Sequence, residues 1–133
     1  MNVAYAQEPQ LGAEEFIALL RNTSLGERRP VDDVERIRRM IEHADIMLTA
    51  RVDGRLVGIA RTITDYSFAT YLSDLAVDEA HQGQGIGREL IRRTQEITGN
   101  EALLVLIAAP QAQTYYPHIG LEQHPSCWFL PRG

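Results

Sequence analysis

The chain has 133 residues, a net charge of −5 and a single cysteine, Cys127. This length suffices for one domain with its own hydrophobic core, residues 1–133, and is too short for two. The acidic balance argues against nucleic acid as the main partner, because phosphate backbones bind basic surfaces. A single cysteine excludes an intrachain disulfide. No apolar run approaches the roughly 20 residues of a membrane span, and no signal peptide is recognisable. We therefore expect a cytoplasmic protein without membrane contact.

The first third of the chain predicts one short strand and two helices. A strand is expected over residues 2–7. Apolar residues then recur at helical spacing in two segments, 12–23 and 32–44, which a break containing glycine and proline separates. Asp32 and Glu35 stand in the positions of a capping box, so the second helix is expected to begin there.

The middle of the chain predicts a meander of three strands. These strands are expected over residues 46–52, 56–64 and 68–77. Asp53-Gly54 separates the first two, and this dipeptide is the strongest short signal for a hairpin turn. The meander would form the centre of a sheet.

The last third predicts a helix, a strand, a short helix and a final strand. The first helix is expected over residues 86–98, where a glycine ends it. The continuous apolar run 102–107 is typical of a strand buried on both faces in parallel pairing. A short helix opens at Pro110, and a last strand over 126–130 closes the chain, with Cys127 as a filler of the core or of a strand edge.

A glycine-rich turn joins the third strand of the meander to the next helix. Gly83, Gly85 and Gly87 let the backbone bend tightly, and the unpaired amide groups at the start of the helix form a ready site for a phosphate. The spacing fits neither of two familiar phosphate sites. A P-loop requires a lysine, which this chain lacks, and the dinucleotide fingerprint requires glycine where Arg88 or Leu90 stands.

The pattern that fits this turn is Gln82-x-x-Gly85-x-Gly87. Together with the preceding Leu75-Ala76-Val77, it resembles the acetyl-CoA-binding signature of the GCN5-related N-acetyltransferase (GNAT) superfamily. The resemblance implies that the strand lies along the pantetheine arm and that the turn amides hold the pyrophosphate of CoA. The residues it assigns to the cofactor are Leu75, Ala76, Val77, Gln82, Gly83, Gln84, Gly85, Ile86, Gly87 and Arg88. A glycine-rich turn without a ligand is the alternative interpretation.

A second segment of the chain matches the same family. Ala112, Tyr115, Tyr116 and Gly120 occupy the places of its alanine, aromatic, tyrosine and glycine. The resemblance implies that Tyr116 is the general acid. A phenol has a pKa of about 10 and a thiol of about 8.5, so at neutral pH the phenol is protonated and can donate to the departing sulfur. Packing against the cofactor is the alternative role.

Asp74 is the candidate general base, because it lies on the strand beside the expected reaction centre and could take a proton through water. It could equally hold a substrate ammonium or cap a loop. A free backbone N–H near Leu75 or Ala76 is expected to meet the carbonyl oxygen. The segment 107–110 departs from the pattern, since many relatives place a polar side chain for the cofactor there.

The resemblance implies an α/β fold of the GNAT type, with a central mixed twisted sheet of about six to seven strands and helices on both faces. The activity it implies is direct transfer of acetyl from acetyl-CoA to a primary amine. Asp74, Asp65 and Glu79 favour a small cationic acceptor, and the four scattered histidines predict no metal site. Transfer of another acyl group and a non-catalytic CoA-binding sensor or interaction domain are the alternatives, and a homodimer is compatible with the resemblance.

Overall fold

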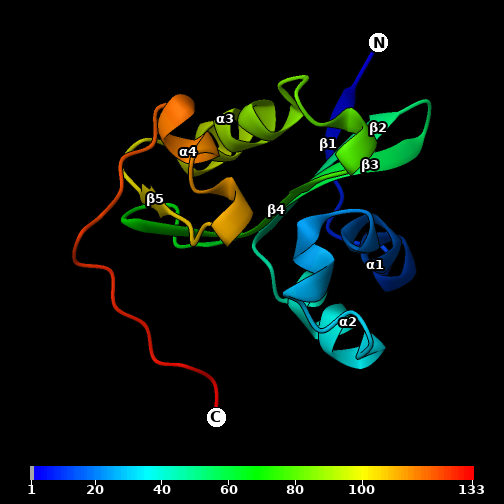
Figure 1. The fold of residues 1–133 in the computed structure, drawn as a ribbon, viewed down its shortest axis with the longest axis horizontal. Helices are drawn as coiled ribbons and strands as arrows, with labels where there is room; N and C mark the ends of the chain where they lie inside the picture. The colour runs from blue at the N-terminus through cyan, green and yellow to red at the C-terminus, as the bar shows by residue number, and fades with distance from the viewer. Residues whose placement is uncertain (1) are drawn as a thin grey trace.

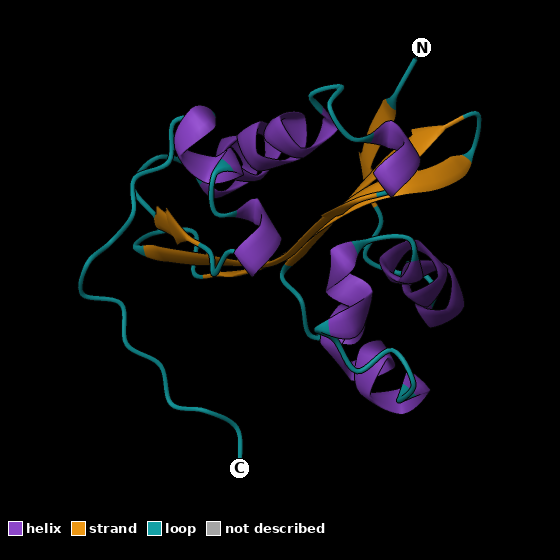
Figure 2. Ribbon diagram, in the orientation of Figure 1, coloured by secondary structure: helices purple, strands orange, loops and turns teal. Residues whose placement is uncertain are grey.

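The centre of the structure is a five-stranded sheet in the order β1-β2-β3-β4-β5, with helices on both of its faces (Figures 1 and 2). It is a computed structural model that describes residues 2–133. The strands are β1 (Ala4–Gln7), β2 (Ile46–Val52), β3 (Arg55–Thr64), β4 (Ala69–Val77) and β5 (Leu103–Val105). The helices are α1 (Ala13–Arg21), α2 (Val34–Glu42), α3 (Ile86–Thr98) and α4 (Tyr115–His118), with 3-10 turns η1 (Ser24–Glu27), η2 (Glu79–His81) and η3 (Pro110–Ala112).

The expected meander is confirmed. Strands β1 to β4 pair with their neighbours in antiparallel fashion, and β5 pairs with β4 in parallel fashion. Asp53 and Gly54 have φ angles of 50° and 80°, as a tight hairpin turn of the primed type requires. The parallel pair is joined by α3, so the chain crosses the sheet once between β4 and β5.

Two hydrophobic cores lie on opposite faces of the sheet. On one face, Phe16 and Leu20 of α1 and Ile37 of α2 pack against sheet residues that include Ile59. On the other face, Leu90 and its neighbours in α3 pack against a second set of sheet residues. Figure 2 shows this sandwich, with α1 and α2 on one side of the strands and α3 on the other. The expected arrangement of helices on both faces is therefore confirmed.

The helix boundaries follow local chemistry. Helix α3 spans the expected residues 86–98 and ends at Gly99, whose φ is 81°. Helix α2 begins one residue later than the capping-box pattern predicted, because Asp33 rather than Asp32 accepts a hydrogen bond from the Arg36 amide, at 3.1 Å.

A β-bulge interrupts the pairing of β3 with β4. Arg61 faces Asp74, but the next residue, Thr62, faces Leu72, so Ser73 is the extra residue. Leu72 consequently belongs to the core beneath α3, whereas Asp74 turns toward α1 and α2 with its partner Arg61. The bulge thus places two residues of one strand, two positions apart, on opposite faces of the sheet.

The C-terminal part of the chain differs from the prediction. The sheet has five strands rather than six to seven, because residues 126–130 form no strand and only 103–105 of the run 102–107 are paired. That run was predicted to be buried on both faces, yet Leu103 and Val105 are exposed. Cys127 is also exposed and fills neither a core nor a strand edge. Nothing in the described residues packs over this edge of the sheet.

None of the helices described over residues 2–133 has both the length and the apolar character needed to cross a membrane.

Candidate active site

A small cavity opens where β4 and β5 separate. The two strands are paired only as far as Tyr71 and Val105, and beyond that point they diverge. The cavity between them has a volume of about 60 Å³. Its walls come from the η1 region, from β4 and from the segment after β5, and they comprise Ser24, Leu25, Arg29, Leu72, Ser73, Leu75, Leu106, Ile107, Ala109, Ala112 and Tyr116. The divergence leaves one edge of β4 free of a β5 partner beyond Tyr71, as the binding of an extended ligand along that strand would require.

Tyr116, the candidate acid, lies in the wall of this cavity. Its side chain packs against the hydrophobic core beneath α3. Burial raises the pKa of the Tyr116 phenol above its usual value, and the neighbouring Tyr115 raises it further. The two rings meet edge to face, with centroids 5.2 Å apart. The phenol is therefore kept in its protonated form, the state in which it can donate a proton.

The glycine-rich turn lies at the start of α3. Gly83 and Gly85 adopt φ angles of 79° and 84°, which side-chain-bearing residues rarely take, and the space where their side chains would stand is open. Gly85 is the N-cap of α3, and its carbonyl accepts the first hydrogen bond of the helix from Glu89, at 3.0 Å. Gln82 closes the turn, because its side-chain amide donates to the Val77 carbonyl at 3.1 Å. The amides at the helix start point into this open turn.

The hydroxyl of Tyr115 reaches the start of α3. A Cβ atom at Gly87 would come within 2.9 Å of that oxygen, so any larger residue there would require the Tyr115 side chain to shift. Burial raises the pKa of the Tyr115 phenol, and the charge and backbone amide of Arg88 offset part of this rise. Tyr115 thereby ties the short helix α4 to the turn, and it brings Tyr116 beside the same turn.

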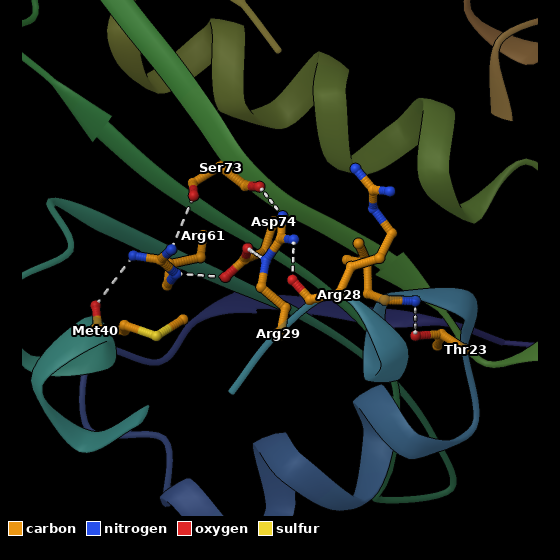
Figure 3. Close-up of polar contacts among 8 residues, drawn as sticks. Thr23, Arg28, Arg29, Met40, Arg61, Ser73 and Asp74 are labelled. Atoms are coloured by element: carbon orange, nitrogen blue, oxygen red, sulfur yellow. Dashed lines mark hydrogen bonds and ion pairs between the residues drawn. The ribbon is translucent and has the colours of Figure 1, made fainter. Parts of the chain in front are cut away.

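Asp74 is fully buried and is held by two arginines (Figure 3). One carboxylate oxygen accepts from Nε of Arg29 at 2.6 Å, and the other accepts from Nε of Arg61. Both arginines also bind the bulge residue Ser73: Arg29 donates to its carbonyl and Arg61 donates to its hydroxyl, each at 2.8 Å. Because Asp74 has no exposed surface, a substrate in the cavity has no direct contact with its carboxylate.

The arginines of this cluster are functional candidates that sequence reasoning missed. Arg29 lies in the loop after η1 and lines the cavity, whereas Arg61 lies on β3 and is buried. A signal existed, because Asp74 is the one charged residue of an otherwise uncharged strand and a buried carboxylate requires a cationic partner. The sequence does not say which of 13 arginines supplies it.

The other two acids expected near the mouth do not line the cavity itself. The Asp65 carboxylate accepts hydrogen bonds from the Ser67, Phe68 and Ala69 amides of its own turn, at 2.7 to 3.1 Å. Glu79 lines an open hollow of about 640 Å³ beside the cavity. Among residues 2–133, no three histidine, cysteine or acidic side chains come together in the manner of metal ligands.

The hollow and the cavity adjoin each other. Ser24 lines both, and Gln82 of the glycine-rich turn and Gln111 of η3 line the hollow. The cavity with Tyr116 thus adjoins a hollow that reaches Gln82, the residue before the first glycine of the turn. An extended ligand with an anionic end and a reactive end could extend from the cavity into this hollow.

Comparisons with known proteins agree with this geometry. A family model described as "Acetyltransferase (GNAT) domain" matches residues 20–127. The chain is 36% identical over 76 residues to histone acetyltransferase TAP1 of Glycine max, a match that covers 53% of this chain and 32% of that protein. The chain therefore spans about a third of the length of this relative.

Solved structures share the fold at low sequence identity. A GNAT family acetyltransferase from Streptococcus pneumoniae superposes with a TM-score of 0.79 at 18% identity, covering 99% of this chain and 100% of the other. Aminoglycoside N-acetyltransferase AAC(6')-Iy, solved in complex with CoA, superposes with a TM-score of 0.75 at 17% identity, covering 98% and 95% of the two chains. At such identities the likeness extends to the fold alone.

Proposed function

Because the chain belongs to the GNAT acetyltransferase family, we propose that it transfers the acetyl group of acetyl-CoA to a primary amine of a small molecule. The observation that carries this proposal is the adjoining pair of cavity and hollow, which together extend from Tyr116 to Gln82 of the glycine-rich turn. The turn offers helix-start amides for an anion, and the cavity offers a half-buried phenol.

The residues present fit acetyl-CoA. The open turn formed by Gly83 and Gly85 leaves room for a bulky anion against the α3 amides, and the free edge of β4 can pair with amide groups of a pantetheine arm. Residues 82–88 would hold the pyrophosphate, and 75–77 would hold the arm. When bound, acetyl-CoA supplies a thioester whose acyl carbon accepts the amine.

The chain's own groups would then assist the transfer. The amine nitrogen forms its bond to the acyl carbon, the carbon–sulfur bond breaks, and Tyr116 donates its proton to the departing sulfur. The nitrogen releases one proton, which restores the phenol through solvent. Asp74 has no exposed surface and is not part of the cavity wall, so this scheme assigns it no proton transfer. Backbone amides near Leu75 remain the proposed donors to the carbonyl oxygen.

Calorimetric titration of acetyl-CoA and of free CoA tests the proposal. Wild type is expected to bind both at micromolar strength, and Gly85→Glu is expected to abolish binding, because it brings a side chain and a negative charge into the pyrophosphate turn. The matched control is Gly54→Glu, which creates the same strain at a φ of 80° in the distant β2–β3 hairpin. That variant should bind as wild type does.

Failure of folded wild type to bind either ligand would overturn the acetyltransferase proposal. Binding without transfer to any amine would instead favour a CoA-binding sensor, and equal or better transfer from succinyl-CoA would favour another acyl donor.

The exposed apolar residues of β5 and of the C-terminal segment favour a second copy of the chain as a further partner.

A further inference from the structure

The cavity at Tyr116 carries a single charged side chain, and that side chain is basic. Arg29 is the one ionisable group besides Tyr116 among the residues that line it. Asp74, one of the acids expected from the sequence to attract a cationic acceptor, has no exposed surface and is not part of the wall. The acids Glu27 and Glu79 line the adjoining hollow instead, together with Arg21.

The charge cluster behind this wall is not balanced. Arg29 and Arg61 contribute two positive charges, and Asp74 contributes one negative charge. Arg61 is almost fully buried, whereas the Arg29 side chain keeps 20% of its surface exposed. The surplus positive charge is therefore presented to the cavity through Arg29.

Arg29 also keeps unused hydrogen-bond donors. A guanidinium group has five N–H groups. Within the described residues, Nε donates to Asp74, one terminal nitrogen donates to the Ser73 carbonyl, and the other donates to the Arg28 carbonyl at 2.9 Å. One N–H on each terminal nitrogen is left, and such a pair is matched to the two oxygens of a carboxylate. The three bonds already made hold the group in place, so little freedom is lost when an anion binds.

We propose that the acceptor is a small amine that carries a carboxylate, as an amino acid does, and that Arg29 binds this carboxylate while the amine lies toward Tyr116. This inference rests on the proposed function and names the substrate class of the same site. It replaces the cationic acceptor expected from the sequence. The cavity suits a small group of this kind, because its volume is only about 60 Å³.

Acetyl transfer to matched acceptors tests the inference. Each of a panel of amino acids is compared with its own primary carboxamide, which has the same side chain and a similar amine but no carboxylate charge, and release of free CoA thiol is measured. Wild type is expected to show a kcat/KM at least tenfold higher for the best acid than for its amide. In Arg29→Gln that ratio should fall to near one, through a higher KM for the acid.

Two further variants separate recognition from folding. Arg29→Lys keeps the charge and should recover part of the preference for the acid. Arg28→Gln changes the exposed neighbour, whose side chain lies outside the cavity, and should retain the full wild-type ratio. Circular dichroism confirms that each variant is folded. A wild-type preference for amides, or a ratio that Arg29→Gln leaves unchanged, would overturn the inference while the acetyltransferase proposal stood.

A measurement without turnover covers the case in which the panel contains no efficient acceptor. Glycine and glycinamide are titrated into 15N-labelled protein saturated with CoA, and the Nε–H signal of Arg29, assigned from its absence in Arg29→Gln, is followed. A saturable shift with glycine and none with glycinamide is expected. No shift with glycine would overturn the inference, and failure to bind CoA at all would instead overturn the proposed function.

Discussion

At the residue scale, the two adjacent tyrosines have separate tasks. The hydroxyl of Tyr115 contacts the start of α3, whereas Tyr116 lines the cavity between β4 and β5. Their rings support each other edge to face. This division explains how a helix of only four residues, α4, can hold a phenol in a fixed position beside the free edge of β4.

Tyr116→Phe is expected to lower kcat by about 10²-fold, because the phenylalanine ring keeps the packing but cannot donate a proton. The KM for acetyl-CoA should change little. Since burial raises the pKa of Tyr116 above its usual value of about 10, the wild-type kcat should show little decline due to this group as the pH rises from 7 to about 9. Steady-state kinetics across this pH range check both statements.

Tyr115→Phe is the matched control, and its kcat should stay within about threefold of wild type. If Tyr116→Phe turned over as fast as wild type, Tyr116 would only pack against the cofactor and the general acid would have to be sought elsewhere.

The residues that sequence reasoning found and missed differ in one physical respect. Gly83 and Gly85 could be predicted because a turn and a helix start are local features, coded by neighbouring residues. The contacts of Asp74 could not, because Arg29 precedes it by 45 positions and the loop that brings them together is set by packing of the whole layer. The ion pairs of Asp74 could therefore be identified only from the structure.

At the element scale, an ion cluster fastens β1, α1 and β2 to one another. Arg51 of β2 donates to both oxygens of Glu8, which follows β1, at 2.8 and 2.9 Å. It also donates to both oxygens of Glu15 in α1, at 2.6 and 2.9 Å. These bonds hold the pKa of Glu8 and of Glu15 below the usual value of 4.5. The cluster closes the sheet edge opposite to β5.

Arg51→Gln is expected to reduce the free energy of unfolding at pH 7 by about 1 kcal/mol, the usual range for partly exposed pairs. The two carboxylates are more acidic in the folded state than in the unfolded state. Their contribution is therefore fully present above pH 4.5 and is lost as the pH falls through the lowered pKa values. Urea unfolding at several pH values should show wild type and variant converging in acid.

Arg38→Gln provides the comparison, because Arg38 makes only an exposed pair with Glu35 on α2. It should cost less than about 0.5 kcal/mol. A difference between wild type and Arg51→Gln that persists unchanged at low pH would show that Arg51 acts through packing rather than through its ion pairs.

Elements with local signals were predictable, and elements that depend on a distant partner were not. The hairpin at Asp53-Gly54 and helix α3 were confirmed because turn chemistry and helical periodicity are written in adjacent residues. The run 102–107 was wrongly predicted to be buried on both faces. An apolar run indicates side chains that are stabilised by burial. It does not indicate whether another part of the same chain packs over them.

At the scale of the whole molecule, two uncovered apolar surfaces stand out. Leu103 of β5 is 65% exposed, and in the C-terminal segment Trp128 is 90% and Leu130 is 94% exposed. Figure 1 shows this segment leaving the body of the molecule without lying on any helix or strand. Exposed apolar groups of this kind usually mark an interface, and β5 is an edge strand with a free side.

We expect two copies to associate by laying the C-terminal segment of each along β5 of the other, which is a symmetric and therefore closed arrangement. Sedimentation velocity over a range of concentrations should show a monomer–dimer equilibrium. Emission from Trp128, the sole tryptophan, should shift to shorter wavelength as the dimer forms.

Trp128→Ser combined with Leu130→Ser should give a monomer at every concentration, because these residues supply the apolar contact. A wild-type monomer whose tryptophan emission stays that of a solvated indole would contradict the expectation. A monomer with a shielded indole would show instead that the segment folds onto its own β5.

The bulge at Ser73 has a consequence for how this protein can change in evolution. The extra residue, Ser73, changes which face of the sheet the residues of β4 point to. Leu72, before the bulge, packs in the apolar layer beneath α3, whereas Asp74, after it, points to the ionic cluster on the other face. Deleting Ser73 alone would leave Leu72 and Asp74 adjacent and still on opposite faces, but it would remove the carbonyl and the hydroxyl that bind Arg29 and Arg61. Pairing the present residues of β4 without a bulge would instead turn Asp74 toward the apolar layer beneath α3. Substitutions that preserve the bulge are therefore compatible with the ionic cluster, whereas a change that lets β4 pair regularly is not.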